Sequence, residues 1–449
     1  MDANVKRTGR YSQRLPEQMP HCRHARRKVL NSYIFQNHRS LLNLIWISFF
    51  FIAFVTGVVR FLFFGETQIF GEMMLAMFTL SKTAFDIALG LTGVLALWLG
   101  IMRIGERSGF VQLLTRGLTP LFRRLMPEVP ADHPALGCIV MNLSANALGL
   151  DNAATPLGIK AMQELQELNP DKETASNAQI LFLVINTSAV TLFPVTIFTY
   201  RAQMGAVNPT DVFIPLLIAT YISTLTGLLA VALVQKINLF DRVIFAYVAG
   251  FTGFIAALLF YFSGLDQAAM RDQSALLSHL ILFTLVIVFI VGAMVKRVNA
   301  YEAFIEGAKE GFRTAVTIIP YLVAMLVAIG VFRASGALEL AIDALRSGID
   351  ALSLDHRFVD AIPTALMKPF SGSGARAMMV DTMQTLGADS FAGRLASIVQ
   401  GSTETTFYVL AVYFGAVGIK NTRYAAGCGL IADFGGILAA IFVAYWFFG

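Results

Sequence analysis

Charged side chains are scarce in this sequence. Asp, Glu, Lys and Arg make up 14% of its 449 residues, whereas 56% are hydrophobic and the mean hydropathy is +0.66. Soluble domains carry about 25% charged residues, so this composition excludes a soluble protein of this length. We expect an all-α integral membrane protein, because a helix satisfies its own backbone hydrogen bonds in hydrocarbon.

Cysteines and catalytic motifs are sparse as well. Cys22, Cys138 and Cys428 are widely spaced, which argues against a disulfide framework. The sequence has no phosphate-binding Gly-Lys-Ser/Thr loop and no paired-His zinc helix. His21, Cys22 and His24 could form a metal site, but the flanking arginines and the lack of a second ligand pair favour a solvated tail. We therefore expect no enzymatic activity, no cofactor and no metal site.

The basic charge is concentrated at the N-terminus. Residues 1–40 hold nine Lys or Arg against two acidic residues. They lack the apolar stretch and cleavage site of a secretory signal peptide. We expect a disordered cytoplasmic tail that is attracted to anionic lipid headgroups, and no nucleic-acid binding, because a positive-inside topology signal explains the same residues.

Apolar runs of spanning length recur along the remaining chain. About 20 residues are needed to cross the hydrocarbon, and the Lys- and Arg-rich connections are expected to be cytoplasmic. Two shorter, polar segments, 133–150 and 361–379, are expected to be re-entrant hairpins that enter from opposite faces. The prediction is two inverted repeats, 41–235 and 236–449. About nine transmembrane helices are expected, at 40–64, 87–102, 178–200, 212–235, 243–265, 274–295, 314–332, 395–419 and 424–448.

Weak internal similarity supports the repeat. Arg107-Ser108-Gly109 resembles Ala334-Ser335-Gly336, and residues 188–193 resemble residues 402–407. The charge pattern is not fully consistent with this topology, because one outer connection carries three arginines. These are Arg333, Arg346 and Arg357.

Small polar residues interrupt the apolar runs at matching places in the two halves. An unpaired polar group in hydrocarbon costs several kcal/mol, so such clusters survive only where they are buried in protein or line a wet cavity. Paired interruptions in a duplicated membrane protein indicate the binding site of a transporter. The candidate substrate- or ion-binding residues are Asn142, Ser144, Asn146, Asp151, Asn152, Asn186, Ser188, Ser371, Ser373, Gln400, Ser402, Thr403, Glu404 and Thr405.

Glu404 is the sharpest single signal among them. A carboxylate inside a predicted crossing is costly unless it faces a polar interior or is protonated. It could bind the substrate or a coupling ion, or it could be a structural carboxylate paired with Lys368 or Arg376. Asp86 and Asp433 lie near a segment end or a Gly-rich turn, so we expect them to serve packing.

The first cluster also has two interpretations. A helix that starts near Asp151, ahead of Pro156, would favour an anion at its amide end. Alternatively, these residues cap a helix and join its neighbours, as small and hydroxyl residues do throughout membrane bundles. The clustering of several such residues favours the binding role.

Longer motifs resemble a known family of membrane proteins. In the first half, Asp132-His133-Pro134-Ala-Leu-Gly, Met141-Asn-Leu-Ser-Ala-Asn and Ile185-Asn-Thr-Ser resemble spore maturation protein A. In the second half, Ser371-Gly-Ser-Gly and Gln400-Gly-Ser-Thr-Glu-Thr-Thr-Phe resemble spore maturation protein B. The resemblance extends over roughly residues 41–449, so the chain resembles a fusion of the two.

The resemblance implies a nucleoside-recognition, or Gate, domain, which is similar to parts of concentrative nucleoside transporters and of the bacterial ferrous-iron transporter B. We therefore expect a multi-pass protein of the bacterial inner membrane with a cytoplasmic N-terminus. It would move a small polar solute of the nucleoside, peptide or ion class, coupled to Na⁺ or H⁺, as a monomer or a homo-oligomer. The alternative is a non-transporting scaffold that recruits cell-envelope or sporulation-type factors, and solute flux in liposomes distinguishes the two.

Overall fold

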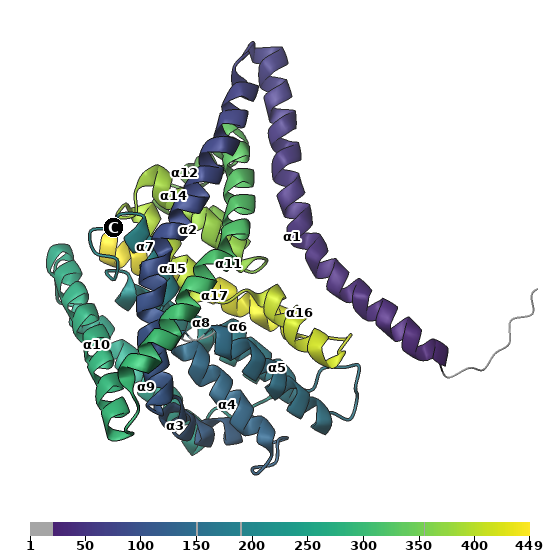
Figure 1. Cartoon of the computed structure of the whole chain (residues 1–449), viewed down its shortest axis with the longest axis vertical. Coiled ribbons are helices and arrows are strands. Elements are labelled where there is room, and N and C mark those ends of the chain that lie inside the picture. The colour runs from purple at the N-terminus through teal and green to yellow at the C-terminus, as the bar shows by residue number, and fades with distance from the viewer. Residues whose placement is uncertain (1–20, 150, 189–190, 354) are drawn as a thin grey trace, which may run out of the picture.

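The computed structural model describes the backbone of residues 21–149, 151–188, 191–353 and 355–449, and the side chains of these segments from residue 43 onward except at 151–153. All its named elements are helices, and one isolated bridge pairs Thr174 with Asn421. Figure 1 shows their arrangement. The elements are α1 (His21–Phe64), α2 (Ile69–Arg107), α3 (Phe110–Leu125), α4 (Pro134–Ala147), α5 (Asp151–Leu168), α6 (Asn177–Thr187), α7 (Val195–Gln203), α8 (Phe213–Gln235), α9 (Arg242–Ser263), α10 (Gln267–Val295), α11 (Ala300–Ala334), α12 (Ala337–Ala351), η1 (Arg357–Ala361), α13 (Ile362–Met367), α14 (Gly372–Leu386), α15 (Phe391–Ser402), α16 (Thr406–Val417) and α17 (Ala425–Phe448).

Seven of the described helices are long and apolar enough to cross a membrane. They coincide with seven of the nine predicted crossings, so the prediction of an all-α, multi-pass membrane protein is confirmed. Helices α9 and α10 bury few of their side chains, as expected of helices that face lipid. The seven are Asn43–Phe64 of α1 and the whole of α2, α8, α9, α10, α11 and α17.

The other two predicted crossings are not continuous helices. Residues 178–200 are divided into α6 and α7, and residues 395–419 into α15 and α16. The first break ends at Pro194, which has no N–H to donate to a helix. The second contains Thr403 in an extended conformation, with φ −141° and ψ 171°. Glu404 therefore lies in a helix break, and its expected place inside a spanning helix is wrong.

Both predicted hairpins are present and are longer than expected. Helices α4 and α5 pack against each other, and the turn between them contains Gly149 at φ 69°. In the second half α13 and α14 flank the turn at residues 368–371. The first hairpin thus ends at Leu168 and the second at Leu386, because each includes a return helix beyond its polar cluster.

The two halves repeat one order of elements with opposite direction. Helices α2 and α11 pack antiparallel, since Gly307 approaches Leu99 and Gly311 approaches Ala96. Helices α8 and α17 also run antiparallel and form the second large helix contact. The short helices α3 and α12 each follow a left-handed glycine, Gly109 at φ 84° and Gly336 at φ 80°. Antiparallel pairing of equivalent helices is the geometry of an inverted repeat.

Helix α1 corrects one expectation about the N-terminal tail. It begins at His21, so residues 21–40, which we expected to be disordered, are helical. The sequence has no Gly or Pro between His21 and Thr56, so nothing interrupts the helix. In Figure 1 this N-terminal part leads away from the bundle. Residues 1–20 lie outside the described residues.

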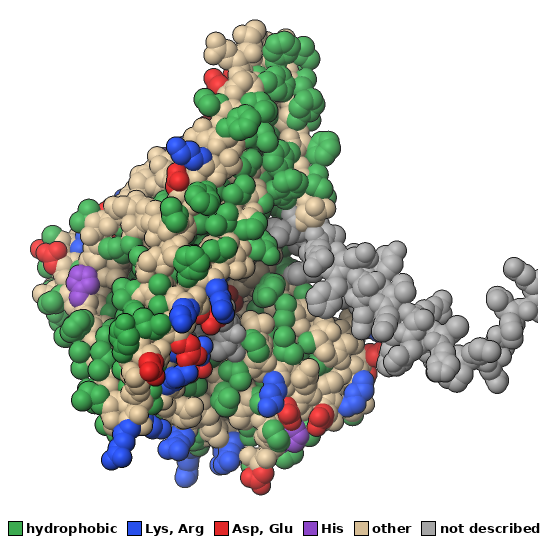
Figure 2. All heavy atoms as spheres, in the orientation of Figure 1, with side chains coloured by type: hydrophobic (Ala, Val, Ile, Leu, Met, Phe, Trp, Pro, Cys, Tyr) green, Lys and Arg blue, Asp and Glu red, His purple; other side chains and the backbone are tan. Residues whose placement is uncertain are grey.

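The arginines that run against the charge bias are held in ion pairs. Arg333 contacts Glu339 at 2.7 Å and Asp381 at 2.6 Å, and Arg357 contacts Asp355 at 2.7 Å. Arg346 is paired in the same way with two aspartates. Figure 2 shows other Lys and Arg side chains gathered along the lower edge of the molecule.

Candidate functional site

The two helix breaks cross each other at the interface of the halves. The backbone N–H of Glu404 donates to the carbonyl of Thr187 over 2.7 Å. Each break is also joined to the hairpin of its own half: Leu192 N–H donates to Ala147 O at 2.8 Å, and Phe407 N–H donates to Pro369 O at 3.0 Å. Backbone groups released by the breaks are thereby satisfied inside the protein, as membrane burial requires.

Glycines of α17 let this helix approach the second break closely. A Cβ on Gly436 would lie 2.6 Å from Cγ2 of Thr403, and a Cβ on Gly429 would lie 2.7 Å from Cγ2 of Thr406. No real Cβ atom tolerates such distances. These two glycines therefore allow the second helix break to pack closely against α8 and α17.

Three of the predicted asparagines meet in one buried network. Asn146 Nδ2 donates to Asn186 Oδ1 at 2.8 Å, which joins the first hairpin to the first broken helix. Asn142 Nδ2 donates to Ala154 O at 2.7 Å and to the hydroxyl of Tyr413 at 3.3 Å. The Tyr413 hydroxyl lies 3.5 Å from Asn186 Oδ1 and so connects the second half to the network. Tyr413 could not be identified from the sequence, because its partner Asn142 lies 271 positions away.

The second part of the site is centred on Asp433 in α17. This residue is 1% exposed, and Thr406 Oγ1 donates to its Oδ2 at 2.7 Å. Thr403 lies beside the carboxyl, and the charges of Lys368 and Glu404 act on it. Lys368 is itself 3% exposed. We expected Asp433 only to serve packing. The signal that could have identified it is that α17 contains no other charged residue.

Several polar atoms around the crossing are buried without a hydrogen-bond partner among the described residues. The large majority of buried polar atoms in proteins have a partner, and leaving one unsatisfied costs about 1–3 kcal/mol. A bound solute, ion or water would satisfy them. They are Asn142 Oδ1, Gln400 Oε1, Thr403 Oγ1 and Asp433 Oδ1.

The remaining predicted residues have mostly local roles. Ser188 and Ser402 donate to carbonyls of their own helices, at 3.0 Å in each case. Ser371 caps α14 by accepting from Gly374 N–H at 3.0 Å, and lies 3.2 Å from the hydroxyl of Ser373. Ser144 is fully buried, 3.5 Å from Thr115.

Gln400, Thr405 and Glu404 lie along the second break itself. Gln400 Nε2 is 3.5 Å from Gly372 O, and Thr405 is buried. The side chain of Glu404 is exposed, and only its backbone takes part in the crossing contact described above. The side chains of Asp151 and Asn152 lie outside the described residues.

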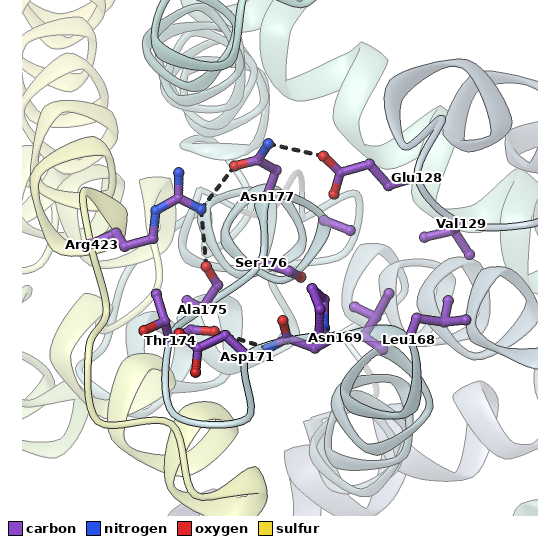
Figure 3. Close-up of a pocket in the computed structure, with 13 residues that line it drawn as sticks. Glu128, Val129, Leu168, Asn169, Asp171, Thr174, Ala175, Ser176, Asn177 and Arg423 are labelled. Carbon is purple, nitrogen blue, oxygen red and sulfur yellow. Dashed lines mark hydrogen bonds between the residues drawn. The ribbon is translucent and has the colours of Figure 1, made fainter.

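Two loop pairs connect the halves at opposite ends of α8 and α17. The first loop pair, residues 168–177 and 418–424, is joined by Ala175 N–H donating to Asn421 O at 3.0 Å and by Lys420 pairing with Glu173 at 2.7 Å. It borders a cavity of about 460 Å³, where Arg423 donates to Ala175 O and to Asn177 Oδ1 at 3.0 Å each (Figure 3). In the same view Asn177 turns its amide to Glu128, at 2.9 Å.

The second loop pair, residues 201–211 and 388–394, is held by a buried charge cluster. Arg201 is fully buried and donates to Asp211 at 2.8 Å and to Ala388 O at 2.8 Å. It also contacts Asp389 at 3.2 Å, and Arg394 pairs with Asp211 at 2.7 Å. Both ends of the interface between the halves are thus closed by direct contacts.

One group of described residues has the composition of a metal site. His133, Glu164 and Glu167 each offer a ligand atom within 4.8 Å of the others. However, Nδ1 of His133 accepts a hydrogen bond from Ala135 N–H at 3.2 Å. A neutral imidazole that accepts at Nδ1 carries its proton on Nε2, so this ring is not prepared to bind a metal ion through Nε2.

Comparison with known proteins agrees with the repeat architecture. The family described as Gate, nucleoside recognition, matches residues 88–204 and 315–420, and each stretch contains one hairpin and one broken helix. Spore maturation protein B of Bacillus subtilis (strain 168) is 50% identical over 155 residues, which is 34% of this chain and 85% of that protein. Spore maturation protein A of the same strain is 42% identical over 183 residues, which is 41% of this chain and 90% of that protein.

No solved structure matches the chain. Each relative corresponds to part of the chain, as expected of a fusion of the two, and together they confirm the resemblance seen in the motifs. The chain therefore belongs to the family of Gate-domain membrane proteins that includes spore maturation proteins A and B.

Proposed function

We propose that this protein is a secondary transporter of the bacterial inner membrane that moves a small polar solute between its two inverted halves. The observation that carries the proposal is the crossing of two helix breaks at Thr187 and Glu404, surrounded by buried polar atoms that have no hydrogen-bond partner in the part of the chain that the structure describes. Broken helices at a repeat interface are the usual construction of a transporter binding site. None of the described residues of the site is an activated nucleophile, and we propose no enzymatic activity.

The polar atoms without partners among the described residues, at the crossing of the two breaks, define the chemistry that the solute must have. Asn142 Oδ1 and Gln400 Oε1 are acceptors that no described residue pairs, while the hydroxyl of Thr403 can donate or accept. A solute with both N–H or O–H donors and carbonyl-type acceptors would satisfy them. Nucleosides and small peptides have this combination, and the description of the matching family as nucleoside recognition favours the first.

The two loop pairs would act as the gates of this transporter. Both are closed in the structure, by Lys420–Glu173 at one end and by the Arg201 cluster at the other. Alternating access requires that one opens while the other stays closed. The Lys- and Arg-rich lower edge in Figure 2 supports a cytoplasmic position for the end with the first loop pair, whose Asn177 lies beside Arg123, Arg124 and Lys236.

Uptake by the purified full-length protein in liposomes tests the proposal. Nucleosides, dipeptides and metal ions would be offered under Na⁺ or H⁺ gradients. We expect saturable uptake of one class, lost in Asn186→Ala and retained in Gln273→Ala, a change on the exposed face of α10. Absence of flux under every gradient would contradict transport and favour the scaffold alternative.

A further inference from the structure

We propose that Asp433 is the site at which a coupling proton binds and leaves during transport. This inference rests on the proposed function, and it assigns the driving ion. A proton would add to Oδ1 of Asp433 from one aqueous phase and leave the same oxygen toward the other, so that only an O–H bond forms and breaks.

The position of Asp433 separates it from ordinary structural carboxylates. It is the one charged residue of α17, a helix of spanning length, and it is 1% exposed. It faces the second helix break, since Thr406 and Thr403 next to that break lie at its carboxyl. A buried carboxylate in a membrane segment is retained at considerable cost and is usually functional.

The hydrogen bonds of Asp433 leave one oxygen open. Thr406 Oγ1 donates to Oδ2 at 2.7 Å, whereas Oδ1 has no partner among the described residues. An ionised carboxylate offers about four acceptor positions, and the two threonine hydroxyls at this carboxyl, those of Thr406 and Thr403, are too few to satisfy it. A proton on Oδ1 removes the charge. The resulting O–H group can donate a hydrogen bond to the hydroxyl oxygen of Thr403, which has no partner among the described residues.

The charges around Asp433 come from the parts of the site that would move. Lys368 lies at the turn of the second hairpin and Glu404 in the second break, and both act on this carboxyl. Protonation of Asp433 would end its attraction to Lys368. It would thereby release the hairpin turn from α17, which links proton binding to a conformational change.

The other elements packed against α17 add few titratable groups near Asp433. Helices α6 and α8 contain no Asp, Glu, Lys, Arg or His. Helix α16 contributes Tyr408 and Tyr413. The charged residues of α10 and α15 that contact α17 do so at its far end, where Arg271 meets Phe447 and Arg394 meets Phe448.

A proton fits this site better than a metal cation does. The charges of Lys368 and Glu404 at this carboxyl oppose each other, so they favour no fixed cation. A proton needs no shell of oxygen ligands, and the open groups here are a carboxylate oxygen and one hydroxyl.

Infrared difference spectra of the full-length protein in liposomes, recorded between acidic and alkaline pH, would test the site directly. We expect a protonated-carboxyl C=O band that disappears in Asp433→Asn and persists in the control Asp86→Asn, an exposed aspartate of α2. Thr406→Val removes the donor that stabilises the carboxylate. In this variant the band should persist to higher pH. An unchanged difference spectrum in Asp433→Asn, or an unchanged titration in Thr406→Val, would overturn the proposal.

A flux measurement separates this inference from the proposed function. For the solute identified by the liposome screen, Asp433→Asn should lose at least about tenfold of the uptake driven by a pH gradient while retaining solute exchange at equal pH. Full gradient-driven uptake in Asp433→Asn would overturn the proton site and leave transport standing. A titrating Asp433 band together with no flux of any solute would instead contradict transport.

Discussion

Glu404 and Thr187 belong to opposite halves of the chain, yet the N–H of one donates to the carbonyl of the other over 2.7 Å. This hydrogen bond joins two helix breaks at the point where they cross. In a continuous helix each group would be bonded four residues away along its own chain. Here the hydrogen bond within the helix is replaced by one between the halves. Any relative movement of the halves must therefore stretch or break the hydrogen bond between Glu404 and Thr187.

Tyr413→Phe tests the amide network. The change removes one hydroxyl that lies 3.3 Å from Asn142 and 3.5 Å from Asn186, while the ring keeps its stacking on Phe182. We expect a loss of about 1 kcal/mol of stability and weaker solute binding, seen as a lower Tm and a raised KM for uptake. Tyr408→Phe alters an exposed ring of the same helix and should change neither.

Arg201→Met and Lys420→Met compare the two loop pairs. Arg201 is fully buried, so its loss leaves Asp211 with only Arg394 as its charge partner and should cost about 3–5 kcal/mol. The exposed pair Lys420–Glu173 should contribute no more than about 1 kcal/mol. Thermal unfolding of each variant in detergent measures its loss of stability. Equal losses of Tm would show that the second loop pair is not a buried electrostatic contact.

Gly436→Ala tests the close approach of α17 to the second break. The new methyl group would meet Thr403 Cγ2 at 2.6 Å and Ser223 Cβ at 2.9 Å. Overpacking of this kind costs about 1–3 kcal/mol, and it would also displace Thr403 and reduce uptake. Gly427→Ala, in the same helix, meets nothing within 4 Å and should be neutral or slightly stabilising. If both variants behave alike, close packing at Gly436 is not important.

Cysteine labelling tests the topology. In a background without the native Cys residues, a cysteine in place of Asp171 should react only with reagent on the cytoplasmic side. One in place of His356 should react only from outside. Both positions are exposed, in connections that belong to different halves. Labelling of both from a single side would refute the inverted arrangement.

Much of the architecture could be predicted from local sequence. Hydropathy located seven crossings that are continuous helices, and the paired polar clusters located both hairpins. The two breaks were not predicted, because residues 178–200 and 395–419 each read as one continuous crossing. The pairing of Ser108-Gly109 with Ser335-Gly336 correctly identified equivalent turns, because a left-handed conformation requires glycine at both places. These features depend on neighbouring residues alone, so they can be recognised in a single sequence.

The composition of the site was less predictable. The structure brings the predicted residues Asn142, Asn146 and Asn186 together, whereas Tyr413 was not among the predicted residues and Asp433 was expected only to serve packing. The side chain of Glu404 is exposed, although its place in an apolar run predicted burial, because the helix break turns it outward. Residues 1–40 looked disordered from their charge, although those from His21 onward continue α1.

The amino-acid sequence is enough to show that the chain is a membrane protein, crosses the membrane repeatedly and carries a polar interruption in each half, because each polar group placed in hydrocarbon raises the free energy locally. Which polar groups meet depends on the packing of the helices. Asp433 is hydrogen-bonded by Thr406 and lies in the field of Lys368, 65 positions away, and the asparagine network joins residues up to 271 positions apart. Such contacts depend on how antiparallel halves pack around glycines, which no local pattern specifies.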